Sequence, residues 1–244
     1  MRRFLLLFAG LVTLLASVVG SSESGTREYW VITDIGPGAA VDINESGQVV
    51  GRDAFVWQNG KKTQLGTLGG RRSGARAINN RGQVVGDSTT KNGTSHAFLW
   101  QNGTMRDLGT LGGPTSIAMA INEHGQVVGS SDTRNGSQHA FLWHNGKMRD
   151  LGTLGGAYAA GSSAIDVNER GQVVGSSYSS TISYGQLGAG VHAFLWQNGT
   201  MRDLGTLGRN PPTSIASRST IAAGSLATAR PPATGDRSSG ATAG

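Results

Sequence analysis

One unit of sequence is written four times in this chain, and no other feature constrains its fold as strongly. Each copy contains an Ala-Phe-(Leu/Val)-Trp segment, an Asn-Gly turn and a stretch ending in Leu-Gly-Thr-Leu-Gly, and is preceded by Asn-x-x-Gly-Gln-Val-Val-Gly. The tryptophans follow one another at intervals of 43, 43 and 53 residues: Trp57, Trp100, Trp143 and Trp196. A repeat of this length is one supersecondary unit that buries its apolar surface only against its neighbours. We therefore expect the four tryptophans to be structural residues of a repeat fold.

The second copy shows how such a unit is built. Short runs with β-branched and aromatic residues between turn residues predict four strands, at Ala75–Asn79, Gly82–Ser88, His96–Gln101 and Thr104–Leu111. Asn102-Gly103 is a strong hairpin signal, because a type I′ turn needs a positive φ at both central residues. Four antiparallel strands in about 43 residues match a propeller blade. We predict an all-β protein of four-stranded antiparallel units, β-propeller-like, with a β-solenoid as the alternative.

Two further features favour the propeller. The Ala-Phe-Leu-Trp run is apolar at consecutive positions, which fits a strand that is covered on both faces. The loop between the second and third strands ranges from Gly51–Ala54 in the first copy to Ser176–Val191 in the fourth, as expected for a variable rim. The segment Trp30–Gly36 resembles the fourth strand of a unit, so an N-terminal strand is expected to complete the last blade and close the ring.

The N-terminus has the three-part pattern of a secretory signal. Arg2 and Arg3 precede the apolar run Phe4–Val19, and small residues follow around Gly20-Ser21. We predict that residues 1–20 are a signal peptide and that the mature protein is secreted or periplasmic, with no membrane contact after cleavage. An uncleaved membrane anchor is the alternative, because the run approaches the length that spans a bilayer.

Composition excludes several classes of site and partner. The chain has no cysteine, which excludes disulfides and thiolate metal sites. Of its 21 Lys and Arg residues, 15 lie between Gly25 and Gly208, where 13 Asp and Glu balance them. This small net charge does not form the basic footprint of a nucleic-acid binder. We expect no nucleic-acid partner.

The repeated motifs resemble the HAF-family extracellular repeat, which is named for its His-Ala-Phe signature. The signature stands here at His96–Phe98, His139–Phe141 and His192–Phe194, and Asp53–Phe55 is the departing copy. The resemblance covers about Trp30 to Gly208. It implies an exported, mostly bacterial repeat protein, and it carries no activity over to particular residues.

After Gly208 the pattern fails. Pro212–Ala216 matches Pro114–Ala118, so a fifth repeat starts, but the sequence from Arg218 onward has no counterpart in the other copies. A shift of reading frame would restore the repeat, and we expect the tail to be disordered or a frameshift product. The predicted organisation is a signal peptide at 1–20, a short linker at 21–28, a four-repeat domain at 29–208 and a degenerate tail at 209–244. The repeats fall at about 40–70, 71–113, 114–156 and 157–208.

Residues present in every copy are best explained by the fold. The equivalent aspartates Asp107, Asp150 and Asp203, with Asp34 in the related place, are expected to cap turns. The histidines His96, His139 and His192 are expected to pack and form hydrogen bonds rather than bind metal. No catalytic triad, phosphate loop or metal motif occurs, so we predict no catalytic residue, no metal and no cofactor.

The fourth copy departs most from the others. Three of the four tyrosines lie there, and an exposed aromatic on a rim loop can stack on a sugar or anchor a partner. We therefore take Tyr158, Tyr178 and Tyr184 as candidate binding residues, with packing of the loop as the alternative.

The function predicted from sequence is an exported, non-catalytic module for binding or scaffolding. Its expected partner is a carbohydrate or another cell-surface or extracellular protein. The alternative is a truncated part of a secreted propeller enzyme that acts on polysaccharide, and a third reading is a nonfunctional truncated product.

Overall fold

The computed structural model describes residues 3–6, 12–18, 30–155, 161–179 and 190–205. The protein is all-β, and its main part is four antiparallel sheets of four strands each, which we call blades 1 to 4. Blade 1 contains β4 (Ala40–Ile43), β5 (Val49–Gly51), β6 (Phe55–Gln58) and β7 (Lys61–Gln64). Blade 2 contains β8 (Gly69–Ile78), β9 (Val84–Thr90), β10 (Ser95–Gln101) and β11 (Thr104–Asp107). Blade 3 contains β12 (Gly112–Ile121), β13 (Val127–Thr133), β14 (Gln138–His144) and β15 (Lys147–Gly152). Blade 4 contains β16 (Ser162–Val167), β17 (Val173–Ser179), β18 (Gly190–Gln197) and β19 (Thr200–Asp203).

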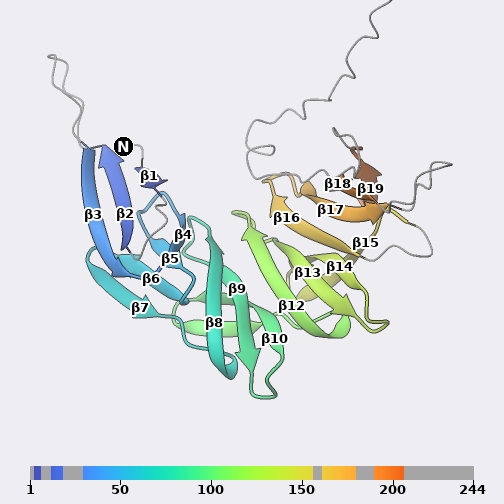
Figure 1. Cartoon of the computed structure of the whole chain (residues 1–244), viewed down its shortest axis with the longest axis horizontal. Helices are drawn as coiled ribbons and strands as arrows, with labels where there is room; N and C mark the ends of the chain where they lie inside the picture. Colours follow the sequence, from blue (N-terminus) through green and yellow to red (C-terminus); the bar gives the residue numbers. More distant parts are fainter. Residues whose placement is uncertain (1–2, 7–11, 19–29, 156–160, 180–189, 206–244) are drawn as a thin grey trace, which may run out of the picture.

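The blades stand side by side in an open, propeller-like arc (Figure 1). The first strand of each blade lies innermost, and β8 contacts β4 on one side and β12 on the other, while β12 contacts β16. Within each blade the strands are paired in chain order. The predicted all-β, propeller-like class is therefore confirmed.

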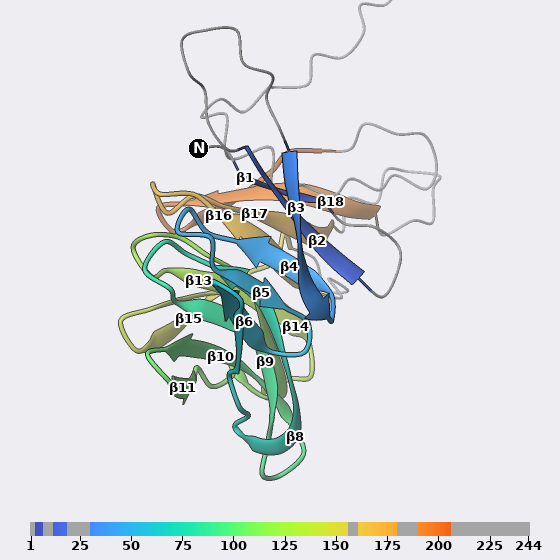
Figure 2. The ribbon, with the colours of Figure 1, turned by 90° about the vertical axis from the view of Figure 1, so that its left-hand side faces the viewer.

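A fifth, three-stranded sheet precedes blade 1. It contains β1 (Arg3–Leu6), β2 (Val12–Val18) and β3 (Trp30–Pro37), and β3 pairs with β2. Ile35 of β3 is buried against blade 1, beside which β3 lies (Figure 2). Blade 4 has β19 as its own fourth strand, so β3 does not complete it as the sequence had suggested.

The described ranges contain no helix of the length and hydropathy that crossing a bilayer requires.

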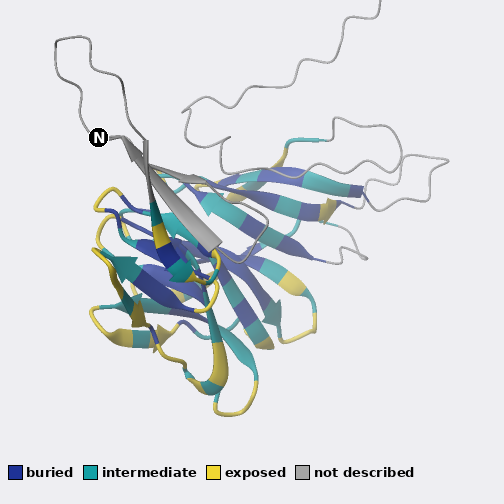
Figure 3. Cartoon of the chain, turned by 60° about the vertical axis from the view of Figure 1, so that its left-hand side comes forward, coloured by how far each residue is buried: buried dark blue, intermediate teal, exposed yellow. Residues whose placement is uncertain are grey.

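The core lies between the blades rather than inside any one of them. We call the side of a blade turned toward the next blade its forward face, and the opposite side its rear face. Between blades 2 and 3, the forward residues Val85 and Ala97 pack against the rear residues Val127, Phe141 and Trp143, and none is more than 6% exposed. Blade 1 meets blade 2, and blade 3 meets blade 4, through equivalent clusters. Burial therefore concentrates along the strands, while exposed residues gather at the turns (Figure 3).

The turns follow the local sequence closely. Asn102 and Gly103 have φ values of 51° and 82°, and Gln101 pairs with Thr104 across the turn, as a two-residue hairpin of the predicted type requires. The Asn-Gly pairs at the same place in the other three blades, Asn59-Gly60, Asn145-Gly146 and Asn198-Gly199, adopt the same conformation. Gly129 is needed for another reason, because a Cβ there would lie 1.9 Å from the carbonyl oxygen of Ile117 on the neighbouring strand.

The fourth strand ends earlier than the sequence predicted. It was expected to continue to Leu111, but β11 stops at Asp107. The Asp107 carboxylate accepts a hydrogen bond from the amide of Gly109 at 2.7 Å, and Gly109 has a φ of 77°. This turn redirects the chain, and the following residues cross to the first strand of blade 3. The first strand of blade 3 starts at Gly112. It therefore begins earlier in the repeat than the first strand of the second copy, which was predicted to begin at Ala75.

The asparagine that opens the Asn-x-x-Gly-Gln-Val-Val-Gly motif connects each blade to the next. The side-chain amide of Asn44 donates to the carbonyl of Asn79 at 3.0 Å, Asn79 donates to Asn122 at 3.0 Å, and Asn122 donates to Asn168 at 2.9 Å. The side-chain oxygen of the motif asparagine, Oδ1, accepts a hydrogen bond from the backbone amide of the glutamine four residues later in the same turn. Asn44, Asn79 and Asn122 are each at most 6% exposed. The side chain of each of these asparagines thus fixes the conformation of its own turn and the distance between that turn and the next blade.

Replacing Asn122 with aspartate tests this connection. Asn122→Asp keeps Oδ1 but loses both hydrogens of the side-chain amide, which leaves the Asn168 carbonyl without that donor and buries a charge. We expect the free energy of unfolding, measured by urea denaturation, to fall by about 2–4 kcal/mol.

The matched control is Asn135→Asp, in an exposed turn of blade 3. It should change stability by less than about 0.5 kcal/mol. Equal effects of the two substitutions would show that the Asn122 amide does not hold the blades together.

Candidate ligand-binding site

The innermost strands enclose a pocket of about 540 Å³. One equivalent position from each of the four blades lines it: Val41, Arg76, Met119 and Ile165. The pocket therefore lies on the axis of the arc, where the first strands converge (Figure 1). Its volume is in the range that holds a small organic ligand.

Three arginines and one aspartate give this axial pocket its charge. Arg52, Arg72, Arg76 and Asp87 all line it, and all come from blades 1 and 2. The Nε atom of Arg76 lies 3.0 Å from Oδ1 of Asp87, and the two side chains are 40% and 28% exposed. The described lining thus contains three arginines and one aspartate, an excess of two positive charges that blades 1 and 2 contribute.

The backbone beside Arg72 is held in place by Thr89. The Arg72 amide donates to Oγ1 of Thr89 at 2.9 Å, and the same hydroxyl donates to the Arg72 carbonyl at 3.1 Å. The hydroxyl of Ser88 also donates to that carbonyl, at 3.3 Å. The strand β8 is irregular here, between Gly69 and Ser73. These hydrogen bonds fix the backbone of Arg72, from which its side chain extends.

Gly74 lets blade 1 approach this side of the pocket closely. A Cβ at Gly74 would lie 3.0 Å from the carbonyl oxygen of Arg52. The equivalent position of blade 3 is Ile117. A glycine here lets the backbone of Arg52 in blade 1 come close to the first strand of blade 2.

This arrangement suits recognition of an anion. Guanidinium groups keep their charge at any physiological pH and present planar sets of donors to carboxylate or phosphate. The hydroxyls of Ser73 and Thr89 add polar groups, while Met119 and Ile165 offer an apolar wall. The pocket can hold a ligand with one anionic end and an uncharged body.

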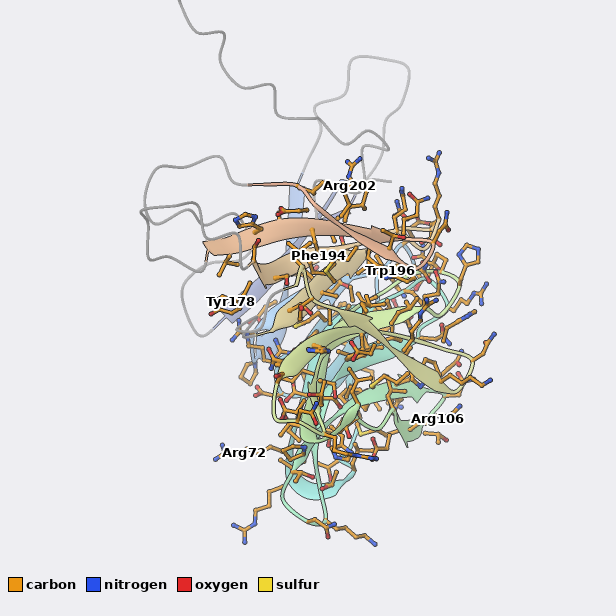
Figure 4. All side chains as sticks on the ribbon, turned by 90° about the vertical axis from the view of Figure 1, so that its right-hand side faces the viewer. Arg72, Arg106, Tyr178, Phe194, Trp196 and Arg202 are labelled. Atoms are coloured by element: carbon orange, nitrogen blue, oxygen red, sulfur yellow. The ribbon has the colours of Figure 1, made fainter. Side chains whose placement is uncertain are left out.

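Of the three tyrosines predicted to bind a ligand, one lies within the described residues. Tyr178, on β17, is 39% exposed and lines a smaller hollow of about 200 Å³ together with Ser163, Ser176 and Val191. Figure 4 shows Tyr178 on the same side of the sheets as Arg72, and opposite to Arg106. Tyr158 and Tyr184 lie outside the described residues.

The repeated histidines pair with the repeated aspartates inside each blade. The Nδ1 atom of each histidine lies 2.8–2.9 Å from a carboxylate oxygen of the aspartate on the next strand: His96 with Asp107, His139 with Asp150, and His192 with Asp203. Each aspartate also accepts the amide of the glycine two residues later, which is the turn role predicted for it. The described ranges contain no group of three or more His, Asp or Glu side chains that could hold a metal ion.

The tryptophans lie on the rear faces, and cations from the preceding blade cover two of them. The guanidinium of Arg106 stands 5.3 Å from the ring centre of Trp143, and that of Arg149 stands 5.1 Å from that of Trp196. These two rings are 6% and 5% exposed, whereas Trp57 and Trp100 are only partly buried. In blade 1 the position of these arginines is taken by Thr63. The tryptophans are thus structural contacts between blades.

The axial arginines were not singled out from the sequence. The information that could have identified them is the difference between copies: Arg76 occupies a position where the other units have Val41, Met119 and Ile165. That position was not known to face a common axis until the four first strands were seen to converge.

Comparison with known proteins adds no relative. No protein-family model matches the chain, and no curated protein has significant sequence similarity to it.

Removing one of the covering arginines should expose a tryptophan. Arg149→Met loses the cation over Trp196 and about 0.5–1 kcal/mol of stability. We expect the fraction of tryptophan fluorescence that acrylamide quenches to rise. Arg170→Met, at an exposed turn residue, is the control and should leave quenching unchanged. Unchanged quenching in both variants would contradict the covering role of Arg149.

Proposed function

We propose that this chain is an exported, non-catalytic binding module that holds a small anionic ligand in its axial pocket. The observation that carries the proposal is the convergence of Arg52, Arg72 and Arg76 on one pocket of ligand size. Export follows from the N-terminal signal pattern, and the resemblance to HAF-family repeats supports a bacterial origin.

The chemistry of the pocket favours binding over catalysis. Among the residues that the structure describes, Asp87 is the one carboxylate that lines it, and it is paired with Arg76 at 3.0 Å. Hydrolysis of a glycosidic bond commonly needs two carboxyl groups in unlike environments at a defined separation. The repeated aspartates of the blades are already engaged by histidines and turn amides. An arginine-lined pocket with a single, paired carboxylate is better suited to hold an anion than to transform it.

An acidic sugar is the ligand class that fits best. Its carboxylate would meet the arginines, its hydroxyls would meet Ser73 and Thr89, and its ring face would lie against Met119 or Ile165. An exported module would meet such groups on polysaccharides that contain uronic acids. This choice agrees with the carbohydrate partner expected from sequence.

Glucuronic acid and glucose form a matched pair of probes, because they share a ring and differ in one carboxylate. We expect titration calorimetry to show binding of glucuronate and none of glucose, with affinity falling as salt is added. Arg76→Met should weaken glucuronate binding by about tenfold or more, which is about 1.4 kcal/mol. Methionine is the natural residue of blade 3 at this position, so the fold should tolerate it.

Arg134→Met, at an exposed turn outside the pocket, is the control and should leave affinity unchanged. Equal binding of the two sugars, or a tight complex that survives Arg76→Met, would refute the axial site.

A further inference from the structure

The forward face of blade 4 is built like those of the other blades. Val174, Ala193, Leu195 and Leu204 form one apolar cluster there, and no residue from another described blade joins it. In blades 2 and 3 the equivalent clusters are completed by the following blade. Ala193 is 8% exposed, whereas its counterparts Ala97 and Ala140 are fully buried.

The forward face of blade 4 also carries an arginine, as the forward faces of blades 2 and 3 do. Arg202 occupies the position of Arg106 and Arg149, which cover a tryptophan of the blade that follows them. Figure 4 shows Arg202 on β19, at the outer end of the arc. The face thus has both the apolar cluster and the charged rim with which the other blades receive a neighbour.

A serine on the first strand of each following blade makes the most specific contact with a forward face. Between blades 2 and 3, the hydroxyl of Ser116 accepts the amide of Ala97 at 2.8 Å and donates to the carbonyl of Gly109 at 2.6 Å. Between blades 3 and 4, Ser162 makes the same two bonds, to Ala140 at 2.8 Å and to Gly152 at 2.5 Å. Both serines are at most 4% exposed.

The sequence after blade 4 supplies this serine at the right distance. Pro212-Thr213-Ser214-Ile215-Ala216 repeats Pro114-Thr115-Ser116-Ile117-Ala118 residue for residue. Ser116 and Ser162 lie 7 and 10 residues after the glycine whose carbonyl they bond, and Ser214 lies nine residues after Gly205. Blade 4 has Ala193 and Gly205 in the places of the two bonding partners.

We propose that the forward face of blade 4 is the docking surface for a fifth unit, and that Pro212–Ala216 docks there as its first strand. Ser214 takes the role of Ser116, between the amide of Ala193 and the carbonyl of Gly205. Ala216 takes the place of Ala118, which is fully buried against blade 2. The proposal is independent of the axial pocket.

A cysteine placed on this face tests the docking, because the chain has no other cysteine. In Leu204→Cys the thiol should react with a maleimide about tenfold or more slowly in the full chain than in a chain that ends at Gly208. Leu151→Cys, at the equivalent position covered by blade 4, is the control and should react slowly in both chains.

Equal reactivity of Leu204→Cys in the two chains would overturn the proposal. Protection that depends on protein concentration would also overturn it, because the cover would then be a second copy.

Hydrogen exchange of the Ala193 amide gives a second readout that needs no cysteine. Ser214→Ala should speed exchange of this amide by about tenfold, whereas Ser217→Ala should not change it. No effect of Ser214→Ala would show that this serine does not hold the strand on blade 4.

Discussion

The contact between the forward face of one sheet and the rear face of the next is the interaction on which the whole molecule depends. A single four-stranded sheet here has apolar residues on both faces, so it cannot be covered by its own chain. Phe98 and Phe141 are fully buried because each lies against the preceding blade. The asparagine side chains add direction to this burial, since each donates to one carbonyl of the next blade and thereby fixes how the sheets align.

This dependence leaves few positions for function. Nearly every residue that recurs among the units is used by the fold: the asparagines connect blades, the histidines of blades 2 to 4 pair with aspartates, and the tryptophans pack between sheets. Function must therefore use positions that face away from these contacts and that differ between copies. The inward position of the first strand meets both conditions, and Arg76 is the one charged residue among its four occupants.

Strands and turns were readable from the sequence because their causes are local. Asn102-Gly103 predicts its own turn, and the run around Phe98 predicts a strand covered on both faces. The end of the fourth strand was misplaced because the Asp107 carboxylate bonds an amide two residues later and redirects the chain. The axial pocket was missed because residues from four separate units meet there, and no single copy contains that information.

The most direct test of this account is equilibrium unfolding of one unit by itself, residues 69–107, followed by circular dichroism. The exposed faces of an isolated blade should prevent folding, so we expect no cooperative transition in urea, while the full chain shows one. A cooperative transition of the single blade, with β-sheet spectra at low denaturant, would contradict the claim that contacts between blades hold this protein together.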